Sequence, residues 1–198
     1  MTYIKSNELF ERIPTEDLYE HIPRPILIAD HLMTPDNMGS MIRIADNIGA
    51  TEMCFLGVES KHSLGKIRRA AASSRGNIRW YFTEEDDLRK IVPQGKTIVA
   101  IETADNATCI YDTALPDNVA FIVGSESQGL NEKLLQQCDM VVYIPVPGPT
   151  RSLNVSHAAA VALFEWMRQK IEVRSQETEA FPHPARDASS VWPRPSSY

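Results

Sequence analysis

Five short runs of the sequence are apolar almost throughout, and they limit the fold more than any other feature. They are ILIA at 26–29, EMCFLGV at 52–58, TIVAIE at 97–102, NVAFIVG at 118–124 and MVVYIPV at 140–146. A half-exposed strand alternates apolar and polar residues, whereas a strand buried on both faces is apolar along its whole length. The pattern predicts an α/β fold with a mostly parallel sheet flanked by helices, and residues 79–83 are a candidate further strand.

Helical patterns occupy the gaps between these runs. Helices are expected within residues 38–48, 63–73, 84–91, 131–138 and 155–170. Gly49 supplies a stop signal for the first of them, and Thr83 and Asn131 are candidate N-caps for the third and fourth. The last has the clearest apolar stripe at helical spacing.

The two ends differ from this core. Residues 1–22 hold a short helical pattern around residues 7–13 and are expected to form an N-terminal extension. Residues 171–198 contain four prolines and few aliphatic residues, which is typical of a flexible tail. One main domain is therefore expected over residues 23–170.

Several classes of protein are disfavoured. The longest apolar runs fall far below the roughly 18 residues of a membrane span, and the first residues lack the apolar core of a signal peptide, so a cytoplasmic protein without a membrane partner is expected. Cys54, Cys109 and Cys138 form no C-x-x-C pair, so neither a disulfide framework nor a metal site is indicated.

Charge is unevenly distributed. The chain has a formal net charge of −6, yet residues 61–79 contain basic side chains and no acidic one. This basic segment is either a solvated helix face or a surface that faces phosphate groups.

Polar loops follow three of the predicted strands at their carboxyl ends, where open α/β sheets bind ligands. The first, at 30–40, leads into a helix that carries Arg43. The loop is either a simple Asn or Asp cap with a glycine inserted for packing, or part of a binding site, because a buried Arg43 would require a phosphate or an internal carboxylate as its partner. The second, at 124–130, has two glycines that let backbone approach a ligand, or that simply form a turn, although a simple turn leaves Glu126 unexplained.

The third loop, at 144–154, has three prolines and is expected to be stiff. Ser152 and Asn154 either cap the following helix or bind a ligand. The G-x-G-x-x-G, G-x-x-x-x-G-K-[ST] and G-x-S-x-G patterns are all missing from these loops, which disfavours dinucleotide, phosphate-loop and hydrolase functions.

Together, the three loops resemble the signature motifs of the SpoU branch of the SPOUT RNA methyltransferases, which includes tRNA guanosine 2′-O-methyltransferases. The N-x-G-x-x-x-R motif is present as Asn37, Gly39 and Arg43. The G-x-E-x-x-G-L turn is present as Gly124, Glu126, Gly129 and Leu130. The I-P…G…S-L-N segment is present as Ile144, Pro145, Gly148, Ser152, Leu153 and Asn154.

The resemblance implies an enzyme that transfers a methyl group from S-adenosylmethionine to a ribose 2′-OH, without a metal, on a fold whose C-terminal part is tied in a deep trefoil knot. The cofactor would contact Ile101, Gly124, Ile144 and Leu153, mostly through backbone groups. Arg43 would be the catalytic arginine, as a base or as a phosphate clamp. Four residues would orient Arg43, the ribose and the methyl donor, namely Asn37, Glu126, Ser152 and Asn154. Of these, Ser152 and Asn154 are the expected direct hydrogen-bonding partners.

The resemblance also implies an RNA partner and a homodimer. The expected RNA-binding residues are Lys66, Arg68, Arg69, Arg75 and Arg79, although the segment RRAAASSRGNIRW departs from the family's K-x-S-x-G-A-like pattern and leaves the exact RNA open. The short terminal extensions favour tRNA over rRNA. The apolar stripe at 155–167 is expected to serve either the dimer or the core of the monomer.

Two alternatives remain at this point. A non-catalytic RNA-binding or assembly protein could retain the fold, although it would have no chemical need for all five candidate catalytic residues. A nucleotide-binding oxidoreductase is disfavoured by the missing G-x-G-x-x-G pattern.

Overall fold

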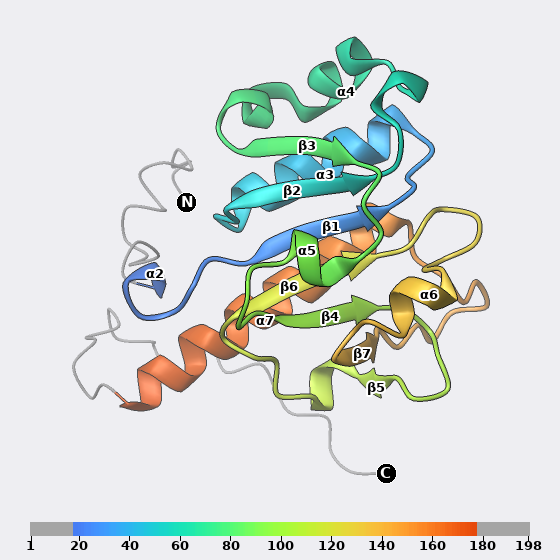
Figure 1. Ribbon diagram of the computed structural model, residues 1–198. Coiled ribbons are helices and arrows are strands. Elements are labelled where there is room, and N and C mark those ends of the chain that lie inside the picture. Colours follow the sequence, from blue (N-terminus) through green and yellow to red (C-terminus); the bar gives the residue numbers. More distant parts are fainter. Residues whose placement is uncertain (1–17, 178–198) are drawn as a thin grey trace, which may run out of the picture.

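Seven strands form one sheet in the order β3-β2-β1-β6-β4-β7-β5 in the computed structural model, which describes residues 18–177 (Figure 1). The strands are β1 Ile26–Asp30, β2 Glu52–Leu56, β3 Arg79–Thr83, β4 Thr97–Ile101, β5 Thr108–Cys109, β6 Val119–Val123 and β7 Met140–Tyr143. Every described pair of neighbouring strands is parallel, which confirms the predicted sheet and its further strand. The expected helix around residues 7–13 and the chain from residue 178 onward lie outside the described residues.

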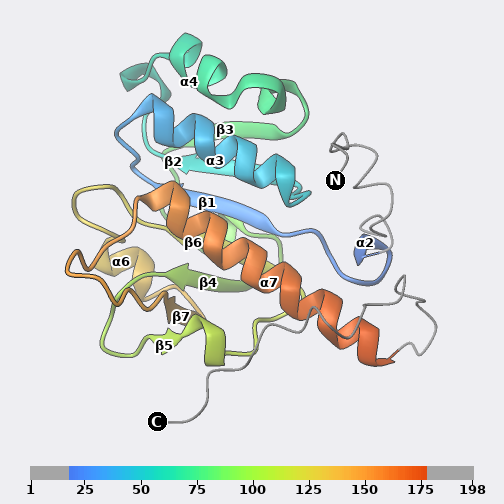
Figure 2. The ribbon, with the colours of Figure 1, turned by 180° about the vertical axis from the view of Figure 1, so that it is seen from behind.

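Helices cover both faces of the sheet (Figures 1 and 2). They are α2 Leu18–His21, α3 Pro35–Asn47, α4 Leu64–Ala71, α5 Leu88–Ile91, α6 Glu132–Leu135 and α7 Val155–Glu177, with short 3-10 turns at Glu59–Lys61, Ala72–Gly76 and Ile110–Asp112. The side chains of α3, α4 and α7 pack in one apolar cluster, and those of α5 and α6 pack in another on the opposite face. Apart from the two-residue β5, each strand supplies alternate residues to the two clusters, as the continuous apolar runs require.

Several boundaries differ from the sequence prediction. The helix expected at 84–91 begins only at Leu88, because Thr83 accepts a hydrogen bond from the Glu85 amide and Asp87 is the actual N-cap. The last strand ends at Tyr143, before the prolines of the following loop, and α7 continues past residue 170 to Glu177. The two-residue strand β5 is too short to leave a periodic signal.

The apolar stripe of α7 serves the core of the monomer. Ala159, Ala162, Leu163 and Trp166 are at most 1% exposed, and the Trp166 indole donates a hydrogen bond to the Pro116 carbonyl at 2.8 Å. The sequence alone did not decide whether this stripe packs in the core of the monomer or in a dimer interface. No helix within residues 18–177 combines the length and apolar character that crossing a bilayer requires.

Gly39 permits the close packing of α3 on α4. A Cβ atom at this position would lie 2.3 Å from the Ala70 Cβ and 2.7 Å from the Ala70 carbonyl carbon. The glycine of the first motif is therefore required by helix packing, which in turn sets the position of the loop before α3.

Candidate active site

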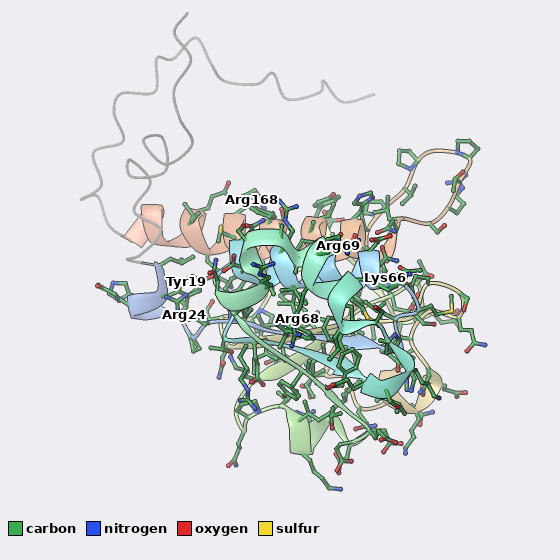
Figure 3. All side chains as sticks on the ribbon, turned by 90° about the horizontal axis from the view of Figure 1, so that it is seen from above. Tyr19, Arg24, Lys66, Arg68, Arg69 and Arg168 are labelled. Atoms are coloured by element: carbon green, nitrogen blue, oxygen red, sulfur yellow. The ribbon has the colours of Figure 1, made fainter. Side chains whose placement is uncertain are left out.

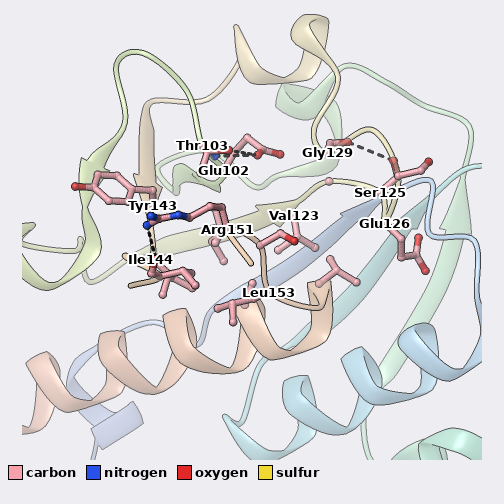
Figure 4. A pocket seen from close by; sticks show the side chains of 17 residues that line it. Glu102, Thr103, Val123, Ser125, Glu126, Gly129, Tyr143, Ile144, Arg151 and Leu153 are labelled. Atoms are coloured by element: carbon pink, nitrogen blue, oxygen red, sulfur yellow. Dashed lines mark hydrogen bonds between the residues drawn. The ribbon is translucent and has the colours of Figure 1, made fainter. Parts of the chain in front are cut away.

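A cavity of about 250 Å³ opens beside the carboxyl ends of β4, β6 and β7 (Figure 4). The loops after β6 and β7 and the first residues of α7 form its walls. Its lining includes all four residues predicted to contact the cofactor, Ile101, Gly124, Ile144 and Leu153. The structure therefore brings together residues from three separate strand ends that the sequence only suggested were neighbours.

Glu126 binds the first loop to the second. Its Oε2 accepts the Met33 amide at 2.8 Å, and its Oε1 accepts the Thr34 amide and hydroxyl, each at 3.1 Å, and the Asn37 Nδ2 at 2.8 Å. Thr34 is the N-cap of α3. The carboxylate thus holds the start of α3 against the cavity loop.

These contacts determine the charge of Glu126. Burial raises the pKa of its carboxyl group, but the hydrogen bonds from Asn37, Met33 and Thr34 outweigh burial and hold the pKa below its ordinary value. Glu126 is therefore ionised at neutral pH. Its oxygens are occupied by donors from the chain, so the carboxylate holds the first loop against the second.

Asn154 connects the third loop to the same network. Its Nδ2 donates to the Asn37 Oδ1 at 3.0 Å, while its Oδ1 accepts the Ser156 amide at 2.9 Å and caps α7. The structure thus confirms the cap role of Asn154, and the same side chain also contacts Asn37 of the first motif. Glu126, Asn37 and Asn154 form a chain of hydrogen bonds through all three motifs.

Ser152 and Arg43 are less constrained. Ser152 lines the cavity and is exposed, and its hydroxyl makes no hydrogen bond within the described chain. Arg43 lies further along α3 than Asn37, outside the cavity lining, and is also exposed. A buried Arg43 would have needed an anionic partner, but the exposed side chain does not, and its guanidinium forms no hydrogen bond or ion pair with residues 18–172.

The glycines of the second motif make room for the chain itself. A Cβ atom at Gly124 would lie 2.0 Å from the Gly129 carbonyl carbon and from the Leu130 nitrogen. Gly129 has φ +68°, in the left-handed region that favours glycine. The loop therefore folds back tightly on the end of β6, and this shape places Glu126 beside the first loop.

The basic segment lies over α4 and the edge strand β3 (Figure 3). The five predicted RNA-binding residues, Lys66, Arg68, Arg69, Arg75 and Arg79, are all exposed. Lys66 sits in the first turns of α4, near the carboxyl ends of the strands, and the Arg68 guanidinium lies 5.9 Å from the centre of the Trp80 ring. Arg79 is the first residue of β3, at the amino ends of the strands, and pairs with Glu52 at 3.2 Å. The structure therefore does not bring it to the site, which lies at the carboxyl ends.

Sequence reasoning missed three contributors to the site. Thr34 is both the cap of α3 and a donor to Glu126. Glu102 follows β4 directly and accepts the Leu130 amide at 2.7 Å, which holds the cavity loop from the other side. Arg151 lines the cavity. A polar residue directly after a buried strand was a usable signal for Glu102, whereas only the folded loops reveal Thr34 and Arg151.

The described residues contain no group of three or more histidine, cysteine, aspartate or glutamate side chains arranged to hold a metal ion. The structure therefore offers no candidate metal centre within that part of the chain.

Known proteins resemble this chain in sequence over most of the described residues. Residues 24–164 match the model of the SpoU rRNA Methylase family. A 23S rRNA (guanosine-2′-O-)-methyltransferase RlmB from a Burkholderia species is 32% identical over 154 residues, 75% of this chain and 61% of the relative. A second RlmB, from Neisseria meningitidis, is 29% identical and is covered to 64%. The chain thus spans about three fifths of the length of these curated relatives.

Solved structures share the fold. One, described as giving structural insights into the 2-OH methylation of C/U34 on tRNA, superposes with a TM-score of 0.67 at 25% identity and covers 75% of this chain and 97% of that one. The AdoMet-bound rRNA methyltransferase from Sinorhizobium meliloti gives 0.66 at 26% identity, with 78% and 59% covered. Because the family match extends over most of the described residues, the chain belongs to the SpoU rRNA methylase family.

Proposed function

We propose that this chain is an S-adenosylmethionine-dependent RNA methyltransferase that transfers a methyl group to a ribose 2′-OH. The observation that carries the proposal is the hydrogen-bond chain Glu126–Asn37–Asn154, which joins the three motif loops beside one cavity. A protein that only bound RNA would have no need to hold these three loops in fixed positions relative to one another. Relatives named as RNA 2′-O-methyltransferases support the same reaction.

The cavity suits the proposed cofactor. Ile101, Val123 and Leu153 provide apolar surface for the adenine ring, and strand-end backbone borders the same space. Its volume of about 250 Å³ is close to the lower end of the roughly 300–1,000 Å³ typical of ligand clefts. When bound, S-adenosylmethionine supplies a methyl group already activated by the sulfonium.

The protein's own task is then alignment and proton removal at the ribose. The pKa of arginine exceeds about 12, so Arg43 is better suited to holding an RNA phosphate and stabilising charge near the hydroxyl than to accepting its proton. Its exposed guanidinium has donors available for that phosphate. Ser152, with a free hydroxyl at the cavity, is the direct hydrogen-bonding partner in this proposal, whereas Asn37, Glu126 and Asn154 position the loops.

The RNA substrate is proposed as tRNA ahead of rRNA. A solved structure described for methylation of C/U34 on tRNA, which superposes with a TM-score of 0.67, supports tRNA, whereas the RlmB relatives are named for 23S rRNA. Lys66, Arg68 and Arg69 on α4 supply a positive surface in an otherwise acidic protein, which the approach of RNA phosphates requires.

The remaining architecture is proposed by analogy with the family. Residues 23–170 would form the catalytic unit of a cytoplasmic homodimer, and the C-terminal part of this unit would be tied in a deep trefoil knot. The course of the chain supports the knot, because it leaves β7 near one edge of the sheet and enters α7 beside α3 (Figure 2).

The proposal is tested by transfer of a tritiated methyl group from S-adenosylmethionine to purified tRNA and rRNA. We expect labelled 2′-O-methyl nucleosides from tRNA with the wild type, and a loss of about a hundredfold or more with Arg43→Ala. Arg89→Ala, on α5 across the sheet, is the matched control and should remain active. Because Arg43 is exposed, its variant should unfold at the wild-type temperature.

Other outcomes would identify the alternatives. Cofactor binding without transfer to either RNA would point to a precursor or an assembled particle as the substrate. Absence of both cofactor binding and transfer would favour a non-catalytic RNA-binding protein. Saturable binding of a nicotinamide cofactor, measured by fluorescence, would favour an oxidoreductase. Near-full activity of Arg43→Ala would refute the role proposed for that residue.

A further inference from the structure

Arg151 is the only basic side chain among the residues that line the described cavity. It stands in the stiff loop at 144–154, and Figure 4 shows its side chain reaching across toward the end of β7. The motif resemblance gave it no role. A cation in a cavity that also holds carboxylates is either their ion-pair partner or a binding group for an anion.

The carboxylates of the cavity have other partners. Glu126 accepts its hydrogen bonds from the loop before α3 and from Asn37. Glu102 accepts the Thr103 amide at 2.8 Å and the Leu130 amide at 2.7 Å. Neither forms an ion pair with Arg151, and no carboxylate within residues 18–172 does so. The positive charge of Arg151 is therefore not neutralised by an ion pair with any of these residues.

The guanidinium is held by a single hydrogen bond. Its Nη1 donates to the Val146 carbonyl at 3.1 Å, which closes the part of the loop that contains Pro147 and Pro149. A guanidinium has five N–H donors in a planar fork. The side chain is thus positioned from one end while most of its donors remain available at the cavity.

We propose that Arg151 binds the α-carboxylate of the methionine part of S-adenosylmethionine, an inference that rests on the proposed function. A carboxylate is the ligand group that a planar guanidinium binds best, through two parallel hydrogen bonds. The acidic residues of the cavity would repel the same group, so Arg151 supplies its counter-charge. Arg151 would thereby fix the direction in which the cofactor lies, with the adenine against the apolar wall at Leu153 and Ile101.

The test measures binding to the full chain by calorimetry, without RNA and without turnover. Two ligands are compared: S-adenosylhomocysteine and S-adenosyl-3-thiopropylamine, which differ only in the carboxylate. For Arg151→Gln we expect the Kd for S-adenosylhomocysteine to rise by about ten- to a hundredfold, with the Kd for the decarboxylated ligand changed less than about twofold. Arg151→Lys should retain part of the preference, and Arg89→Gln should behave as the wild type.

Each other outcome overturns the inference in a recognisable way. An equal rise in the Kd for both ligands would mean that Arg151 only shapes the loop through its hydrogen bond to Val146. Unchanged binding of both ligands would exclude a contact with the carboxylate, and a separate tRNA titration of the same variant would then show whether the guanidinium binds an RNA phosphate. Failure of the wild type to bind either ligand would refute the proposed function itself.

Discussion

Replacement of Glu126 by glutamine should destabilise the protein far more than an ordinary surface substitution. Glutamine has the same shape but exchanges one carboxylate oxygen for an NH2 group. With that group in place of Oε2, it would face the Met33 amide, donor against donor. The Thr34 and Asn37 donors would keep an acceptor, but a neutral one.

The magnitude follows from these four contacts. Loss of an acceptor for one backbone amide costs about 1–3 kcal/mol. Hydrogen bonds to a charged group are roughly twice as strong as neutral ones, so the three bonds at Oε1 also weaken. Because Met33 and Thr34 are exposed and water replaces part of the loss, we expect about 2–4 kcal/mol in total. For a protein of this size that corresponds to a fall in melting temperature of roughly 4–16 °C.

Thermal unfolding followed by circular dichroism tests this prediction, with Glu84→Gln, at an exposed position, as the control. The pKa of Glu126 is lower in the folded protein than its ordinary value of 4.5, so its stabilisation is present above that value and is lost as the pH falls through the folded pKa. The difference between wild type and variant should therefore be constant from pH 7 to about 5.5 and narrow below about 4.5. A difference below about 1 °C at pH 7, or one independent of pH, would show that the ionised Glu126 carboxylate does not stabilise the fold.

Further predictions concern packing and RNA binding. Gly39→Ala should destabilise the protein by about 1–3 kcal/mol in urea unfolding, because its Cβ would clash with Ala70, whereas Gly65→Ala meets open space and should not destabilise it. Equal effects of the two would contradict this account of α3 and α4. Arg69→Gln should weaken tRNA binding and reduce by about 1 the slope of the logarithm of the binding constant against the logarithm of the salt concentration. Arg79→Gln, at the amino end of β3, should change neither. Similar slopes for both variants would exclude α4 as the RNA path.

Local patterns in the sequence determined the layers of this protein. Continuous apolar runs predict strands buried on both faces, and β1, β2, β4, β6 and β7 are found there because only a covered parallel sheet hides both sides of a strand. The Gly49 stop and the Asn131 cap were equally readable, since each depends on neighbouring backbone alone. Helix 84–91 was overestimated, because its acidic residues bind their own backbone instead of continuing a helix.

Motif spacing further indicated which loops gather at the site, but not what their side chains do there. Whether Asn154 caps a helix or joins a site depends on the Asn37 side chain, which lies far away in the sequence. Whether Arg43 is buried depends on which face of α3 meets the sheet. The order of strands and helices could be predicted from the sequence, because periodicity and capping act over a few residues. The donors that Glu126 accepts and the absence of a carboxylate partner for Arg151 within residues 18–172 became visible only in the fold, because hydrogen-bond partners and burial arise where distant segments meet.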